Sequence, residues 1–172
     1  MSWWKTALYD TCSLITLDKL LQDAPSLSKF FPQKVWALEE SFNADQMRVE
    51  TSERLKDRTK FYSLPSLAKL ANLLSSPGLS KSLADVDKLV YATAVDSRIA
   101  VVTGDKRLAK AIEQQGLKVG NMALVLQELA LEKKLGTAAV EKALIRLAKR
   151  QDFLLGMHNP TWDDLKDYTF PD

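Results

Sequence analysis

The chain has 172 residues, of which 46% are hydrophobic and 27% are charged, and its formal net charge at pH 7 is +2. This length fits one domain, residues 1–172, and this charge argues against a basic tail or a broad nucleic-acid patch. Because there is one cysteine, an intrachain disulfide is excluded and a reducing compartment is favoured. No segment has the roughly 18–20 apolar residues of a membrane span or the pattern of a signal peptide, so we expect a soluble cytoplasmic protein with no membrane partner.

Apolar periodicity and breaker residues divide the first half of the chain into five segments. In chain order, these are a strand at 5–9, a helix at 13–21, a strand or helix start at 34–38, a charged helix at 41–60 and a helix at 64–74. The charged segment has neither proline nor glycine, which predicts one long and largely solvated helix. Together with the next helix it forms an expected helical segment at about 41–75.

The second half alternates more regularly between helical and extended patterns. It predicts a helix at 83–95, a strand at 99–103, a helix at 106–115 ended by Gly116, a strand at 117–119, helices at 122–134 and 137–151, and an irregular tail from about 154. Strands that alternate with helices are typical of parallel sheets. We therefore expect an α/β fold with three layers, α/β/α, around a central parallel sheet of four or five strands.

Acidic residues follow two of the predicted strands. Asp10 comes directly after the first strand, and Asp105 follows the strand at 99–103. Taken alone, each of these aspartates is more often a helix N-cap than a ligand. In open α/β sheets, however, ligands bind at the carboxyl ends of the strands, and a third acid, Asp87, opens the helix that leads into the second of these strands. The three acids together predict one acidic crevice.

An acidic crevice of this kind suits a divalent metal ion. Carboxylates that gather within a few ångströms repel one another, and Mg²⁺ or Mn²⁺ is a hard, oxygen-seeking ion that relieves this repulsion. Thr11, Ser13 and Thr103 stand close to the acids in sequence and are suited to orient them or their bound waters. Lys106 and Arg107 lie in the first turn of the following helix, where we expect them to meet RNA phosphates.

Three stretches resemble the motifs of one family, the PIN domains. Residues 10–15, Asp-Thr-Cys-Ser-Leu-Ile, look like the opening motif of these domains, in which an acid precedes Thr or Ser and apolar residues. Residues 87–94 resemble the helix that carries their third acid, and residues 101–108 resemble the motif of their fourth acid. The resemblance extends over roughly residues 6–153, with the motifs in the right order and at the right spacing.

The resemblance implies a metal-dependent ribonuclease, a hydrolase that cuts phosphodiester bonds of single-stranded or structured RNA. Asp10, Asp87 and Asp105 match the metal-binding acids of the family. Many bacterial members, such as the VapC-like toxins, are the toxins of toxin–antitoxin pairs, so an antitoxin protein and a second copy of the chain are implied partners. The charged stretch at 45–60 and the tail after 153 make this chain longer than a minimal toxin.

The family also carries a second acid, usually a glutamate on the helix after the second strand. Glu40, Glu39 and Asp45 all compete for this role. We favour Glu40. If Glu39 were the second acid, the residue directly after it, at a semi-buried position, would be the charged Glu40. The expected catalytic and metal-binding set is therefore Asp10, Glu40, Asp87 and Asp105.

Two other interpretations accompany this one. The uncertain second acid leaves room for a catalytically silent PIN-like module that binds a protein or RNA, and such a module would show no Mn²⁺ binding that depends on the acids. Cys12 lies close to Asp10 but has no histidine nearby in sequence, so we expect a small buried thiol and not a nucleophile.

Overall fold

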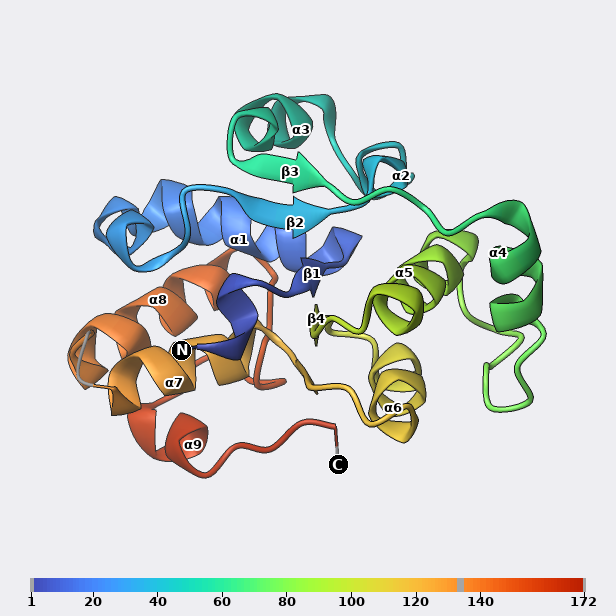
Figure 1. Cartoon of the computed structure of the whole chain (residues 1–172). Helices are drawn as coiled ribbons and strands as arrows, with labels where there is room; N and C mark the ends of the chain where they lie inside the picture. The colour runs from blue at the N-terminus through green and yellow to red at the C-terminus, as the bar shows by residue number, and fades with distance from the viewer. Residues whose placement is uncertain (1, 133–134, 172) are drawn as a thin grey trace.

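Five short parallel strands form the centre of the structure, in the order β3-β2-β1-β4-β5. Figure 1 shows this computed structural model, which describes residues 2–132 and 135–171. The strands are β1 Leu8–Tyr9, β2 Val35–Ala37, β3 Thr59–Phe61, β4 Val101–Val102 and β5 Val119–Gly120. Helices cover both faces of the sheet, so the expected three-layer α/β/α fold with a parallel sheet is confirmed.

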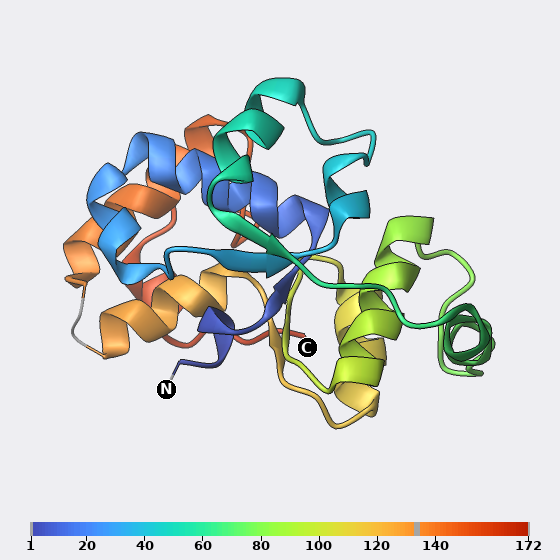
Figure 2. The same ribbon diagram turned by 45° about the horizontal axis from the view of Figure 1, so that its top comes forward.

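Helices α1, α7 and α8 lie on one face of the sheet, and α5 and α6 lie on the other (Figure 1). Helix α4 packs on the outer side of α5, and the tilted view of Figure 2 shows the same arrangement. Among the described residues, no helix is long and apolar enough to cross a lipid bilayer. The helices are α1 Thr11–Asp23, α2 Glu39–Phe42, α3 Val49–Lys56, α4 Leu67–Leu74, α5 Asp85–Ser97, α6 Lys106–Gln114, α7 Met122–Leu131, α8 Thr137–Lys149 and α9 Trp162–Lys166, with 3₁₀-helices η1 Trp3–Lys5 and η2 Pro25–Phe30.

The strands supply side chains to two separate cores, because successive residues of a strand point to opposite faces. Tyr9 and Val102 belong to the core that α1, α7 and α8 cover. Leu8 and Val101 belong to the core under α5 and α6. All four side chains have no exposed surface, so the central strands β1 and β4 are buried from both sides, as a parallel sheet requires.

The order of the strands reverses between β1 and β4. The chain runs from β1 outward to β2 and β3, then returns to place β4 on the other side of β1, in the register Leu8↔Val101 and Tyr9↔Val102. In open α/β sheets, such a reversal leaves a crevice at the carboxyl ends of the two central strands. Asp10 and Thr103 directly follow these two strand ends, so the fold itself directs them to that crevice.

The expectation of a single long helix at 41–60 is wrong. Helix α2 ends at Phe42, α3 begins only at Val49, and residues 59–61 form the edge strand β3, which pairs in parallel with β2. The segment at 41–75 therefore holds three short helices and a strand, and residues 34–38 contain the strand β2. Residues 59–61 gain backbone hydrogen bonds from the open edge of β2, and these outweigh the preference for a helix that the charged residues of 41–60 indicate.

Both ends of the chain are more structured than the sequence indicates. Residues 3–5 form a 3₁₀-turn, so the first strand begins at Leu8. The tail, expected to be irregular from about 154, contains α9, which begins with a capping box between Thr161 and Asp164. The backbone N–H of Trp162 donates to Glu141 of α8 at 2.8 Å, which ties this tail to the helical layer. The expected helix at 122–134 ends at Leu131 in α7, and residues 133–134 lie outside the described part.

Gly116 ends α6 as predicted. It has a φ of 71°, in the left-handed region that glycine adopts without a Cβ clash, and its N–H donates to the carbonyl oxygen of Glu113 at 2.9 Å. This turn reverses the chain into β5.

The burial of α1 gives a test of the fold. We expect Leu17→Ala to lower the free energy of unfolding by about 2–5 kcal/mol, because Leu17 has no exposed surface and its truncation leaves a cavity in the α1–α7–α8 core. Leu67→Ala is the matched control, since Leu67 lies on α4 and is 85% exposed. Urea unfolding followed by circular dichroism measures both, and equal stability of the two variants would contradict this packing.

Candidate functional site

Asp10 is a buried carboxylate at the junction of β1 and α1. It is 2% exposed and caps α1 by accepting the backbone N–H of Ser13 at 2.8 Å. Its other carboxylate oxygen accepts a hydrogen bond from the hydroxyl of Thr103, which directly follows β4. Asp10 thus joins the ends of the two central strands, and its orientation is fixed by both partners.

Asp105 lies across the crevice as the N-cap of α6. Its carboxylate accepts the backbone N–H groups of Arg107 at 2.8 Å and Leu108 at 3.2 Å. Its own N–H donates to the Thr103 hydroxyl oxygen at 3.0 Å, while that hydroxyl donates to Asp10. Thr103 therefore links the two acids, which matches the orienting role expected for it.

Asp87 completes an electrostatically coupled group of three acids. It lies in the first turn of α5, and its pKa is raised to about 6 by desolvation and then by the charges of Asp10 and Asp105, while Arg107 acts in the opposite direction. The pKa of Asp10 is also raised, chiefly by burial, although its hydrogen bonds from Thr103 and Ser13 act against this. The charges of Asp10 and Asp105 thus both act on Asp87, in agreement with the predicted convergence of the three acids.

Other predicted site residues have different surroundings. Thr11 donates its hydroxyl to the carbonyl oxygen of Ser41 at 3.3 Å and not to an acid. The Arg107 guanidinium, expected to meet RNA phosphates, lies 3.4 Å from Asp105 and donates to the Ser82 hydroxyl at 2.8 Å, so it partly neutralises the acid group. Lys106 lines a neighbouring cavity.

A cavity of about 300 Å³ opens beside Asp87. It is lined by Thr11 and Cys12 of α1, by residues 43–46 and by residues 84–87, so Asp45 and Asp85 face it together with Asp87. Of the three candidates for the second acid, Asp45 lines this cavity, while Glu39 and Glu40 do not. The structure therefore does not bring the favoured Glu40 to the wall that Asp87 forms.

Cys12 is exposed, so the expectation of a buried thiol is wrong. The first turn of α1 faces the crevice, and Cys12 lines both the cavity beside Asp87 and a second cavity of about 270 Å³. Partial desolvation, followed by the charges of Asp10, Asp87, Asp152 and Asp105, raises the pKa of the thiol to about 11. The thiol is therefore protonated near neutral pH, which argues against a nucleophilic role, as expected.

Asp152 is a nearby acid that the sequence analysis missed. It follows α8, accepts the Thr16 hydroxyl at 2.8 Å and lies 3.1 Å from the Lys19 ammonium group. It lines the second cavity together with the aromatic side chains of Phe153, Tyr168 and Phe170. No local motif marks this aspartate, because its position beside Cys12 depends on how α8 packs against α1.

The chemistry of this donor set fits a hard divalent cation. All three coupled groups are carboxylates, and the raised pKa values of Asp10 and Asp87 mean that burial and repulsion disfavour their ionised forms, which a bound cation would favour. Within residues 2–132 and 135–171, however, no three His, Cys, Asp or Glu side chains are grouped closely enough to hold one metal ion. Asp10 and Asp105 direct oxygens toward the N-termini of α1 and α6 instead.

Comparisons of the chain with protein-family models, with curated proteins and with solved structures found no match. The interpretation of the site therefore depends on its residues and their geometry.

The coupling of the acids predicts a pH-dependent stability. Because the folded-state pKa of Asp87 is about 6 and its ordinary value is 3.8, ionisation costs the folded state stability as the pH rises between these values, and the cost is complete above them. Asp87→Asn removes this charge, so we expect its free energy of unfolding near pH 7.5 to exceed that of the wild type by about 1–2 kcal/mol, after allowance for screening. The difference should fall steadily as the pH is lowered through 6 and vanish below about pH 3.8, where the carboxyl group is protonated in both states.

The control is Asp85→Asn, which removes a fully exposed carboxylate from the same turn of α5. Urea unfolding at the two pH values measures all three proteins. An Asp87→Asn protein that gains no stability at the higher pH would contradict the coupling.

Proposed function

We propose that this protein is a divalent-metal-dependent endoribonuclease that hydrolyses phosphodiester bonds of unpaired RNA. The observation that carries this proposal is the placement of Asp10 and Asp105, linked through Thr103, at the strand reversal between β1 and β4, where their charges help to raise the pKa of Asp87. Ligands of open α/β sheets bind at such reversals, and perturbed acids gather at functional sites more often than elsewhere. The resemblance of the three acid motifs to PIN domains supports the same chemistry.

Each acid has a distinct part in this proposal. Asp10, held by Thr103 and Ser13, is the rigid ligand, because neither partner leaves its carboxylate free to turn. Asp105 is held by the first turn of α6, and Asp87 adds the carboxylate whose pKa of about 6 is close to neutral pH. A Mg²⁺ or Mn²⁺ ion on these carboxylates would supply Lewis-acid stabilisation of the charge that develops on a phosphodiester oxygen.

An unpaired strand is the substrate class that suits the site. The acids lie in a crevice at the end of the sheet, next to a cavity of about 300 Å³ between α1 and the first turn of α5. A single strand can bring its backbone into such a crevice, whereas a duplex presents a wide and rigid surface. The same cavity faces Asp45, which we propose as the additional acid in place of Glu40.

Cleavage of a mixed single-stranded RNA in the presence of Mn²⁺ tests this proposal. We expect EDTA to abolish cleavage, and Asp10→Asn and Asp105→Asn each to lower the rate by at least about 100-fold. Asparagine is as good an N-cap as aspartate, so both variants retain the acceptors for the first turns of α1 and α6 and are expected to fold. Asp163→Asn, which removes an exposed carboxylate from α9 and lies in none of the cavities described, is expected to cleave like the wild type.

Cleavage that persists in folded Asp10→Asn and Asp105→Asn proteins would refute the proposal. If the wild type neither cleaves RNA nor binds Mn²⁺ through these acids, the silent binding module is the better interpretation. Isothermal titration with Mn²⁺ separates that module from a nuclease whose RNA target is missing from the substrate pool, since the nuclease would still bind the ion.

A further inference from the structure

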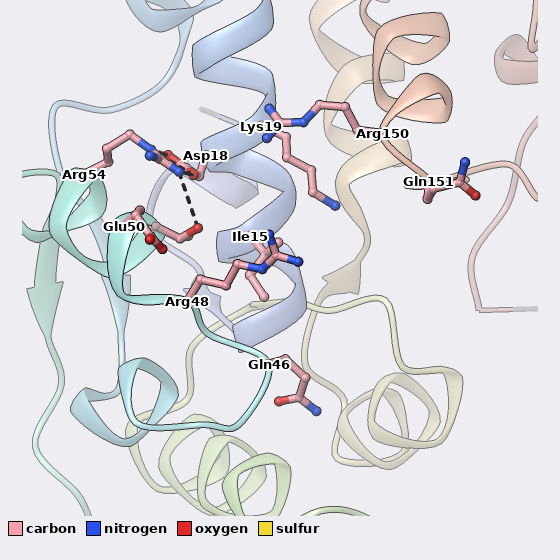
Figure 3. Close-up of a pocket in the computed structure, with 10 residues that line it drawn as sticks. Ile15, Asp18, Lys19, Gln46, Arg48, Glu50, Arg54, Arg150 and Gln151 are labelled. Atoms are coloured by element: carbon pink, nitrogen blue, oxygen red, sulfur yellow. Dashed lines mark hydrogen bonds and ion pairs between the residues drawn. The ribbon is translucent and has the colours of Figure 1, made fainter.

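A basic cavity of about 710 Å³ lies between α1, α3 and the end of α8 (Figure 3). Its lining includes four cations and two acids, Asp18 and Glu50, and two of the cations also pair with Asp152 and Asp23 outside the lining. The cations come from three separate parts of the chain: Lys19 from α1, Arg48 and Arg54 from the start and body of α3, and Arg150 from the end of α8. Only the tertiary structure brings these charges together.

Arg54 is the cation of this cavity that is already neutralised. Its Nη2 lies 2.8 Å from Oδ2 of Asp18, and its Nε donates to Oδ1 of the same carboxylate at 2.9 Å. The Asp18 side chain is 6% exposed, so this two-pronged ion pair serves to compensate a buried charge. We therefore assign Arg54 a structural role and exclude it from ligand binding.

The other three cations are less fully compensated. Arg48 makes no side-chain hydrogen bond or ion pair with any residue in the described part of the chain, and its guanidinium extends over Ile15 of α1 (Figure 3). Arg150 donates to Gln22 at 3.0 Å and to both carboxylate oxygens of Asp23 at 3.4 Å through one nitrogen, Nη1, which partly compensates its charge. Lys19 lies 3.1 Å from Asp152 and retains two further ammonium hydrogens.

The basic cavity adjoins the acidic crevice. Gln46 lines both the basic cavity and the cavity beside Asp87, whose lining contains three acids and no Lys or Arg side chain. Figure 3 shows Gln46 beyond Arg48, toward the helices of the α5–α6 layer. A polyanion that reaches the acids is repelled there until a cation compensates them, but it is attracted at the neighbouring cavity.

We infer that this basic cavity binds phosphates of the same unpaired RNA strand, next to the bond that is cut at the acids. The inference rests on the proposed function and adds to it the direction in which the strand leaves the crevice, from Asp87 past Gln46 toward Arg48 and Arg150. Arginine forks match the geometry of phosphate oxygens, and a lysine adds a point charge. The cavity volume lies within the range of small-ligand sites.

Salt-dependent binding of RNA tests this inference. Fluorescence anisotropy of a labelled single-stranded RNA of about 12 nucleotides is measured in EDTA, so that no cleavage occurs. We expect Arg48→Gln and Arg150→Gln each to weaken binding several-fold at low salt and to reduce the slope of log K against log salt by about 0.7, the value for one phosphate contact on a single strand. Lys110→Gln, which removes one exposed charge from α6 outside the cavity, is expected to leave the slope unchanged.

Wild-type affinity and slope in both arginine variants, or no RNA binding by the wild type, would overturn the inference. A defect shared equally by Lys110→Gln would also overturn it, because the effect would then follow net charge alone. Cleavage in Mn²⁺ is scored separately on the same RNA. Loss of binding in Arg48→Gln, together with a wild type that neither cleaves RNA nor binds Mn²⁺ through the acids, would support the cavity and refute the nuclease. Cleavage with unchanged binding would do the reverse.

Discussion

The buried carboxylate of Asp10 is the constraint around which the site is built. A buried charge is costly unless hydrogen bonds compensate it, and here the backbone N–H of Ser13 and the hydroxyl of Thr103 do so. Thr103 in turn accepts the N–H of Asp105. One hydroxyl therefore couples the end of β1 to the end of β4 and to the start of α6, and it fixes the relative positions of two of the three acids.

The same aspartates serve the fold and the site. Asp10 and Asp105 are N-caps of α1 and α6, the ordinary role of aspartate at these positions. Because each capped helix follows a central strand, each cap also lies at the carboxyl end of the sheet where the strand order reverses. The structural and functional interpretations of these residues are thus complementary, and the raised pKa of Asp87 is the property that capping does not explain.

Charge segregation is the other property on which the proposed binding of RNA depends. The net charge of +2 gives no indication of a polyanion partner, yet the fold gathers acids at the crevice and cations in the adjoining cavity. Arg107, two residues after Asp105 in sequence, faces Asp105 and Ser82, while Arg48 and Arg150 come from distant segments. The electrostatic potential at the crevice and at the adjoining cavity therefore depends on how the segments of the chain pack together, and not on the overall composition.

The alternation of strands and helices, the turn at Gly116 and the three acids beside the central strands could all be predicted from the amino-acid sequence. These features depend on side-chain periodicity, capping and turn chemistry, which act over a few residues. Packing between distant segments, in contrast, makes residues 59–61 an edge strand, turns Asp45 and not Glu40 to the cavity beside Asp87, and brings Asp152 and Arg150 to α1. Each of these outcomes depends on contacts between segments far apart in the chain, where the hydrogen bonds and burial offered by a distant partner outweigh local preference.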